Sequence, residues 1–212
     1  VDNAYSTYSK VYASSGRTAA EVARLLLDTA HLDHIKIVKI NGHLTDHYDH
    51  KKQIVALSSK VYDSTSVAAI GIATHEVGHA LQYKKNYFPI KLRNFLVPVT
   101  NIASVMLWPL VIIGLIFNFM ASTDSIIGMV FIWSGIIFFG LAALFNVVTL
   151  PVEFNASDRA VKILYNSGML TQSETAGAKK VLSAAAMTYV AAMIISVLNL
   201  VRFLLVISNS RR

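Results

Sequence analysis

Long apolar segments with few polar interruptions make up the second half of the chain. Residues 95–120 and 126–150 are each long enough to cross a bilayer core as a helix, which takes about 20 residues, and residues 121–125 form a short polar stretch between them. This pattern predicts a transmembrane helical hairpin. A third apolar segment, residues 181–207, contains Arg202, whose long side chain can reach the membrane surface. We expect this segment to form a third membrane helix.

The first half of the chain has the shorter hydrophobic periods of a soluble domain. Thr18 and Glu21 have the spacing of a capping box and begin an amphipathic helix. Residues 35–40 alternate as a half-buried strand does, and residues 53–58 form a second strand-like segment. We expect residues 44–49 to form a third strand that pairs between these two.

The central segment, residues 66–83, follows a helical pattern and is apolar nearly all round, which is typical of a buried helix. The fold class predicted from these patterns is α+β: a small domain of helix, short β-sheet and central helix, fused to an α-helical membrane bundle. In chain order, we expect a soluble domain at 1–93, the membrane hairpin at 94–150, a connecting segment with a helix at 151–180 and the third membrane helix at 181–208.

Composition supports a membrane protein and excludes several other classes. The 212 residues are 54% hydrophobic and only 15% charged, with a mean hydropathy of +0.52, which excludes a disordered chain. The absence of cysteine excludes a disulfide scaffold, a cysteine-based zinc knuckle and a cysteine nucleophile. The net charge of +7 fits anionic headgroups better than nucleic acid in so apolar a chain. Because the sequence begins at Val1, we expect that a segment preceding it is missing.

Basic residues flank the predicted hairpin on one side only. They are Lys84, Lys85, Lys91 and Arg93 before it, and Arg159, Lys162, Lys179 and Lys180 after it. Cytoplasmic flanks of membrane helices carry an excess of such residues. We therefore expect the soluble part to face the cytoplasm, although a complete third crossing would place Arg211 and Arg212 on the opposite side.

The central helix carries a metal-binding motif, His75-Glu-Val-Gly-His79. Positions four apart lie on one face of a helix, so both imidazoles can reach one cation, with Glu76 beside them. The alternative, two core histidines and a stray glutamate, would bury three polar groups without partners at a cost of several kcal/mol. The motif therefore predicts a zinc site.

A catalytic zinc site usually has three protein ligands and one open position, so a third ligand is needed. The extended motif with a third histidine fails, because Gln82 and Lys85 stand at its Gly and His positions. Of the other glutamates, Glu21 caps a helix and Glu174 lies in a polar stretch, which leaves Glu153. A membrane hairpin returns the chain to the side that it left, and Pro151 can begin a helix that has Glu153 in its first turn.

These residues predict hydrolysis of a peptide bond with a single Zn²⁺ ion as cofactor. The ion lowers the pKa of its water ligand to about 7, and Glu76 acts as the general base. We expect Asn155 and Asp158 to accept hydrogen bonds from the ligating histidines. The candidates for contacting the substrate and stabilising the transition state are His47, Tyr48 and Tyr189.

Four separated blocks of the sequence resemble one family. They are Gly42-His-Leu-Thr-Asp-His-Tyr-Asp49, Ala73-Thr-His-Glu-Val-Gly-His-Ala-Leu-Gln82, Leu150-Pro-Val-Glu-Phe-Asn-Ala-Ser157 and Met187-Thr-Tyr-Val-Ala-Ala192. In this order they resemble the YugP-type putative neutral zinc metallopeptidases of bacterial membranes. That family is similar to the gluzincin-type membrane proteases, which include the HtpX and CAAX prenyl endopeptidases.

The resemblance implies a zincin-like catalytic domain with His75, His79 and Glu153 as zinc ligands and Glu76 as general base. It also implies that residues 44–49 form an edge strand along which an extended peptide would lie. The chain departs from related patterns at Asn155, where family members often have Asp, and at Ser157, where the prenyl proteases have Asp.

The function that we expect is a multi-pass, membrane-anchored zinc endopeptidase of a bacterial cell membrane, with membrane-associated proteins or peptides as substrates. Its partners would be the lipid bilayer and the substrate, without nucleic acid, and protein regulators or an oligomer stay open. The alternative is a non-catalytic zinc-binding scaffold or chaperone. An intramembrane protease is disfavoured, because the apolar run of the motif helix ends at Lys84 and Lys85. A transporter is disfavoured because polar residues in the spans are sparse.

Overall fold

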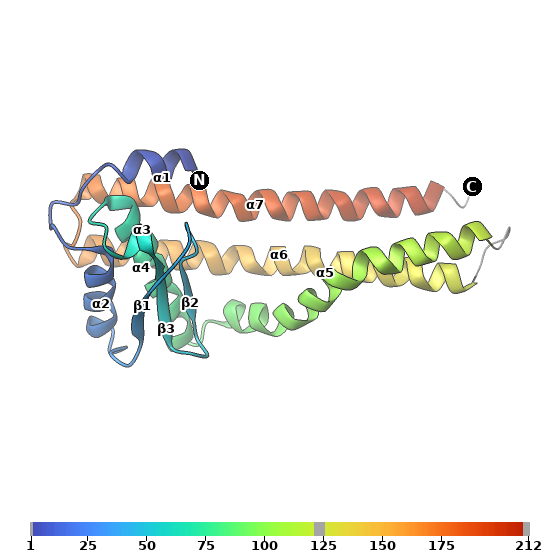
Figure 1. Cartoon of the computed structure of the whole chain (residues 1–212), viewed down its shortest axis with the longest axis horizontal. Coiled ribbons are helices and arrows are strands. Elements are labelled where there is room, and N and C mark those ends of the chain that lie inside the picture. The colour runs from blue at the N-terminus through green and yellow to red at the C-terminus, as the bar shows by residue number, and fades with distance from the viewer. Residues whose placement is uncertain (1, 121–125, 210–212) are drawn as a thin grey trace. The chain divides into compact units, whose positions relative to one another are not determined.

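The computed structural model of the chain describes residues 2–120 and 126–209. The polar turn expected at 121–125 and the arginines at 211 and 212 lie outside the described residues. The predicted α+β class is confirmed. The elements, in chain order in Figure 1, are α1 (Asp2–Tyr8), α2 (Ala19–Thr29), β1 (Lys36–Ile40), β2 (His47–Asp49), β3 (Ile54–Ser58), α3 (Ser59–Tyr62), α4 (Val67–Lys84), α5 (Phe88–Met120), α6 (Ile126–Asn166) and α7 (Gln172–Asn209).

The chain forms two compact units, each assembled from two separate stretches. The first unit contains Val1–Tyr87 and Val152–Thr188, and the second contains Phe88–Pro151 and Tyr189–Arg212. The first unit therefore combines α1 to α4 and the sheet with the last part of α6 and the first part of α7. The motif helix α4 and the segment that follows the membrane hairpin thus belong to the same unit.

The small sheet has β3 at its centre. Its strand order is β1-β3-β2, with β1 parallel and β2 antiparallel to β3. The expectation that residues 44–49 would pair between the other two strands is wrong, because β3 is the strand that is buried along most of its length and has a neighbour on each side. The topology does place β2 at an edge of the sheet, as the family resemblance implied.

One hydrogen-bonded contact fixes the start of β2 against the end of β3. The carboxylate of Asp46 accepts the main-chain N–H of Ser58 at 2.7 Å and the Ser58 hydroxyl at 3.0 Å. Ser58 is fully buried. Because no water is available there, Asp46 supplies the acceptor that these two donors need.

Helices α2 and α4 form the core of the first unit beside the sheet. The expected capping box is present, since the N–H of Glu21 binds the Thr18 hydroxyl and the Glu21 carboxylate binds the N–H of Thr18. Ser66 caps α4 through the N–H of Ala69. Most of α4 is buried, and its apolar residues pack with those of α2 and β3 in one cluster that includes Leu27, Leu57, Ile70 and Val77.

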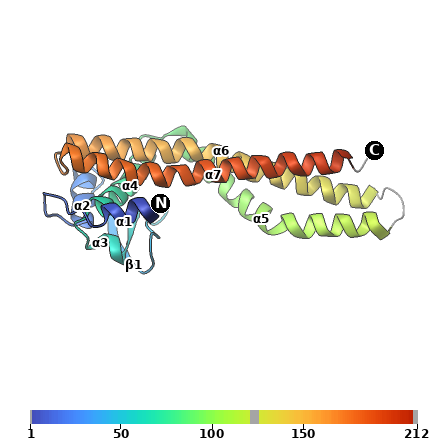
Figure 2. The ribbon, with the colours of Figure 1, turned by 90° about the horizontal axis from the view of Figure 1, so that it is seen from above.

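Three described helices are long and apolar enough to cross a membrane, namely α5, α6 and α7. Figure 2 shows α5 and the first part of α6 side by side within the second unit. They approach closely at Gly114, where an added Cβ would lie 2.9 Å from the carbonyl oxygen of Gly128. Small residues allow this approach of membrane helices. Within the same unit, Asn146 of α6 donates a hydrogen bond to Ser196 of α7 at 3.1 Å.

All three long helices extend beyond the predicted bounds, and α5 begins at Phe88 rather than at residue 95. Helix α6 continues through Pro151 to Asn166, so the expectation that a new helix begins at Pro151 is wrong. Proline inside a helix removes one hydrogen bond, which membrane helices tolerate when neighbouring groups replace it. Helix α7 begins at Gln172, before the apolar segment that predicted it. Glu153 therefore lies inside a long helix and does not have a helix N-terminus to stabilise its charge.

Candidate metal centre

His75 and His79 project from consecutive turns of α4. Their ring centroids are 4.7 Å apart and the rings are nearly perpendicular, at 84°. The helix is fixed by its cap at one end and by burial along most of its length. The spacing of the motif therefore produces the arrangement that it predicted, two imidazoles on one face.

Glu153 reaches the histidines because α6 packs very closely on α4. Val152, Ala156, Ala160 and Leu164 recur at every fourth position of α6 and are all fully buried. Gly78, between the two histidines, faces this stripe, and a Cβ added there would lie 2.6 Å from the carbonyl oxygen of Ala156. Only a glycine permits this approach of the two backbones, which brings the carboxylate to the motif.

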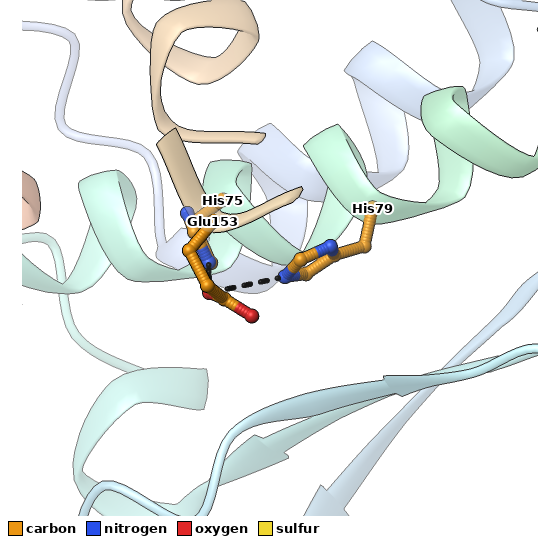
Figure 3. A group of neighbouring side chains, drawn as sticks. All are labelled: His75, His79 and Glu153. Carbon is orange, nitrogen blue, oxygen red and sulfur yellow. Dashed lines mark hydrogen bonds and ion pairs between the residues drawn. The ribbon is translucent and has the colours of Figure 1, made fainter. Parts of the chain in front are cut away.

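The two histidines and Glu153 form a compact cluster (Figure 3). The Glu153 Oε2 atom lies 3.3 Å from Nε2 of His75 and 3.7 Å from Nε2 of His79. One ligand atom of each residue lies within 4.8 Å of the others. The three side chains are mostly buried, His75 being the most exposed at 15%.

This donor set fits a zinc ion. Two imidazole nitrogens and one carboxylate oxygen are ligands that zinc takes in open, three-residue sites. In a tetrahedral site with bonds near 2.0–2.1 Å, neighbouring ligand atoms are roughly 3.3 Å apart. The distances of 3.3 and 3.7 Å between the carboxylate and the imidazoles are close to that value.

The electrostatics of the cluster favour a cation. Burial alone would lower the pKa of His79, but a hydrogen bond from its ring to the Glu153 carboxylate and the charges of Glu76 and Glu153 outweigh burial and raise this pKa above its ordinary value. Negative charge thus dominates at the imidazoles. A site with two carboxylates beside two imidazoles compensates a divalent ion well.

Each histidine has a second partner at its other ring nitrogen. Nδ1 of His79 lies 3.0 Å from Oε1 of Gln82, and Nδ1 of His75 lies 3.2 Å from the Ser157 hydroxyl. With both Nδ1 atoms engaged, both Nε2 atoms point to the same carboxylate oxygen. Contacts of this kind orient metal-binding histidines.

Asn155 and Asp158, which were expected to accept hydrogen bonds from the histidines, have other partners. Asn155 is linked to His79 only through Gln82, because its Oδ1 accepts hydrogen bonds from Gln82 at 3.1 Å and from Arg159 at 2.7 Å. Asp158 is on the exposed side of α6 and pairs instead with Lys162 at 2.6 Å. The pairing with Lys162 reflects their spacing of four along the helix.

The remaining predicted residues lie on three elements. Glu76, next to His75 on α4, is buried. On β2, the ring of Tyr48 packs edge-on against Tyr83, which follows His79 by one helical turn, and burial beside Tyr83 raises the pKa of Tyr48 to about 12. His47 is exposed and donates to the carbonyl of Thr45. Tyr189 lies on α7, in the second unit, so its role stays a prediction.

Sequence reasoning missed Gln82 and Ser157 as partners of the histidines. A local signal existed for Gln82, which follows His79 by three residues and so lies on the same side of α4. For Ser157 the signal was its spacing of four from Glu153, which places both side chains on the same face of α6. Along the sequence, Gln82 stands out only where the longer histidine motif fails, and Ser157 only as a departure from the prenyl proteases.

Comparison with known proteins gives two matches and one absence. The family model described as "Putative neutral zinc metallopeptidase" matches residues 1–208. The protein named "Putative membrane protease YugP" of Bacillus subtilis (strain 168) is 44% identical over 211 residues, which cover 100% of this chain and 90% of that protein. No solved structure matches the chain.

Proposed function

Since the chain belongs to the family of putative neutral zinc metallopeptidases, we propose that it is a membrane-anchored endopeptidase that holds one zinc ion on His75, His79 and Glu153. The observation that carries the proposal is the convergence of these three ligand atoms within 4.8 Å from two helices that are far apart in sequence. A structural zinc site would use a fourth protein ligand. Among the described residues, no fourth His, Cys, Asp or Glu joins the group.

The proposed reaction is hydrolysis of a peptide bond by water. A bound zinc ion would polarise the scissile carbonyl and lower the pKa of a coordinated water. The Glu76 carboxylate would take a proton from the attacking water and deliver it to the nitrogen of the leaving amine as the C–N bond breaks. Because Glu76 is buried beside the histidines, its carboxylate would be held in place without competition from bulk water.

Tyr48 is a candidate for contacting the substrate from the sheet. It lies on the edge strand β2 and packs against α4 beyond His79. Its phenol is protonated at neutral pH and donates a hydrogen bond to Oε1 of Gln53 at 3.4 Å, which a substrate carbonyl would replace as acceptor. A peptide lying along β2 would have such a donor beside it, whereas His47 and Tyr189 are the alternative donors.

We place the site at the cytoplasmic face of a bacterial membrane, with a protein or peptide of that membrane as substrate. Three long apolar helices and the name of the Bacillus protein support the membrane. The basic residues that flank the hairpin support the cytoplasmic side.

The decisive test is Glu76→Gln in the full chain, purified in detergent. We expect the variant to retain zinc, because Glu76 is not a ligand, and to lose about 10²- to 10⁴-fold in cleavage of an unfolded protein substrate. Glu21→Gln is the matched control, since a glutamine also satisfies the capping box of α2. Elemental analysis and cleavage are measured for all three proteins.

The alternative, a non-catalytic zinc scaffold, gives a different result. Both wild type and Glu76→Gln would then bind zinc and neither would cleave any substrate, including the chain itself. In a third variant, Glu153→Ala, retention of stoichiometric zinc would refute Glu153 as the third ligand and with it the proposed site.

A further inference from the structure

Gln82 is a buried polar residue that the proposed mechanism does not use. It lies near the end of α4, is fully buried, and its side-chain amide contacts three groups from two helices. Burying an amide costs roughly 1–3 kcal/mol unless each of its polar atoms has a partner. The partners of Gln82 therefore explain why a polar residue stands there.

The contacts determine which way the amide points. Its nitrogen, Nε2, lies 2.7 Å from the carbonyl oxygen of Val152 and 3.1 Å from Oδ1 of Asn155. A main-chain carbonyl can only accept, so the NH₂ group must face Val152. Asn155 is fixed in turn, because the Nε–H of Arg159 donates to the same Oδ1 at 2.7 Å.

The orientation of the amide dictates the tautomer of His79. With NH₂ facing α6, the Oε1 atom faces Nδ1 of His79 at 3.0 Å and can only accept. Nδ1 of His79 must then carry the hydrogen. In the neutral ring, the lone pair is on Nε2, the atom that faces Glu153.

Gln82 also joins the two helices that carry the ligands. Val152, whose carbonyl it binds, directly precedes Glu153, so one side chain contacts both His79 and the backbone beside the third ligand. His75 lacks such a constraint. Its partner is the hydroxyl of Ser157, which can donate or accept and so leaves the tautomer of His75 open.

We propose that Gln82 is a positioning residue: it holds His79 in the Nδ1–H tautomer and fixes the separation of His79 from Glu153 for metal binding. Asn155 and Arg159 hold the amide from the side of α6. The proposal rests on the proposed zinc site, but concerns affinity for the ion and not cleavage.

The test measures the zinc dissociation constant of the full chain in detergent, by competition with a chromophoric chelator. In Gln82→Met, which keeps the size of the side chain, we expect zinc affinity to fall about 10- to 100-fold, the usual effect of removing a partner of a metal ligand. The matched control is Thr74→Val. Thr74 is also buried on α4. Within the part of the chain that the structure describes, its hydroxyl donates to the carbonyl of Ile70 and makes no hydrogen bond to the three clustered side chains.

A second variant, Gln82→Asn, keeps the amide but shortens it by one methylene, and covers the case in which Gln82→Met does not fold. We expect the same loss of affinity in Gln82→Asn and a smaller loss in Ser157→Ala. In cobalt-loaded samples, the visible spectrum of the Gln82 variants should change relative to wild type, because the ligand geometry at the ion changes.

The outcomes separate the two proposals. Wild-type zinc affinity and an unchanged cobalt spectrum in a folded Gln82 variant would overturn the positioning role, whatever the protein cleaves. Zinc binding that weakens in the Gln82 variants, in a protein without peptidase activity, would support the positioning role and count against the proposed function alone.

Discussion

Replacing Gly78 by alanine should separate the two helices that build the metal centre. A Cβ at this position would lie 2.6 Å from the carbonyl oxygen of Ala156, and the atom it meets belongs to a backbone that cannot rotate away. An ordinary contact begins at 3.4 Å. We therefore expect α4 and α6 to move apart by about 0.8 Å, the difference between these two distances.

The magnitudes decide which property changes most. Alanine stabilises a helix by about 1 kcal/mol relative to glycine, whereas an overpacked core costs about 1–3 kcal/mol, so the net loss of stability should be at most about 2 kcal/mol. Metal–ligand distances, however, tolerate only about 0.2 Å. A separation several times larger than that tolerance should weaken zinc binding at least about 10-fold, because Glu153 lies on the displaced helix.

The assay compares Gly78→Ala with Gly71→Ala, a change of the same kind on the same helix. At Gly71 an added Cβ would lie 3.2 Å from the Cβ of Ala178, a milder contact. Zinc dissociation constants and thermal midpoints are measured for both variants in detergent. If Gly78→Ala binds zinc as tightly as wild type, then close packing at this glycine does not set the position of Glu153, and the reasoning is refuted.

Two further predictions concern the sheet and the edge strand. Asp46→Ala should lower the free energy of unfolding by about 1–3 kcal/mol, because two buried donors of Ser58 lose their acceptor. The control, Asp63→Ala, breaks an exposed ion pair with Lys39 and should lower the free energy of unfolding by at most about 1 kcal/mol. Equal effects of the two variants in denaturant titrations would contradict this account. Folding raises the pKa of Tyr48 from 10.0 to about 12, so the unfolded chain releases the phenolic proton at a lower pH than the folded protein. The contribution of Tyr48 to folding stability is therefore fully present below pH 10 and is lost as pH rises toward 12. Thermal midpoints of Tyr48→Phe should therefore fall less than those of wild type between pH 10 and 12, and parallel curves would exclude Tyr48 as the titrating group.

The membrane segments and helix α2 could be predicted because their signals are local, whereas helices α1 and α3 were not predicted. Hydropathy over about 20 residues decides whether a helix can cross a bilayer, and the capping box at Thr18 depends on residues three apart. Strand order is different in kind. Three short strands can be arranged in several ways, and β3 takes the centre because its burial against α4 and the core cluster outweighs the proximity of residues 44–49 to both neighbours in sequence.

The start of a helix at Pro151 was predicted from a sound local rule that tertiary structure overrides. Proline is favoured in the first turn, but α6 is already helical when it reaches Pro151 and continues to Asn166. The consequence for the site is physical. Glu153 is not stabilised by a helix N-terminus, and its carboxylate lies against His75 and His79 instead.

The metal centre was predictable to the extent that its chemistry lies within one helix. A spacing of four brings two imidazoles together whatever the rest of the fold does, and with only four glutamates in the chain the candidate for a third ligand could be found by elimination. The partners of the histidines could not be found in this way. The spacing along α4 places Gln82 on the side of His79, but only the packing of α6 supplies the two acceptors that orient its amide.

Gly78 links the local motif on α4 to the packing of α6 against it. The motif spacing determines where the imidazoles point, but not how near another helix can come. Gly78 determines that distance, because the absence of its side chain lets the carbonyl of Ala156 approach, and Ala156 lies less than one turn after Glu153. Gly78 thus specifies the approach of α6 as directly as the histidines specify the donors. In a chain with the same two histidines but a residue larger than glycine at position 78, we expect α6 to be held further from α4. A carboxylate at the position of Glu153 would then lie too far from the imidazoles to share an ion with them.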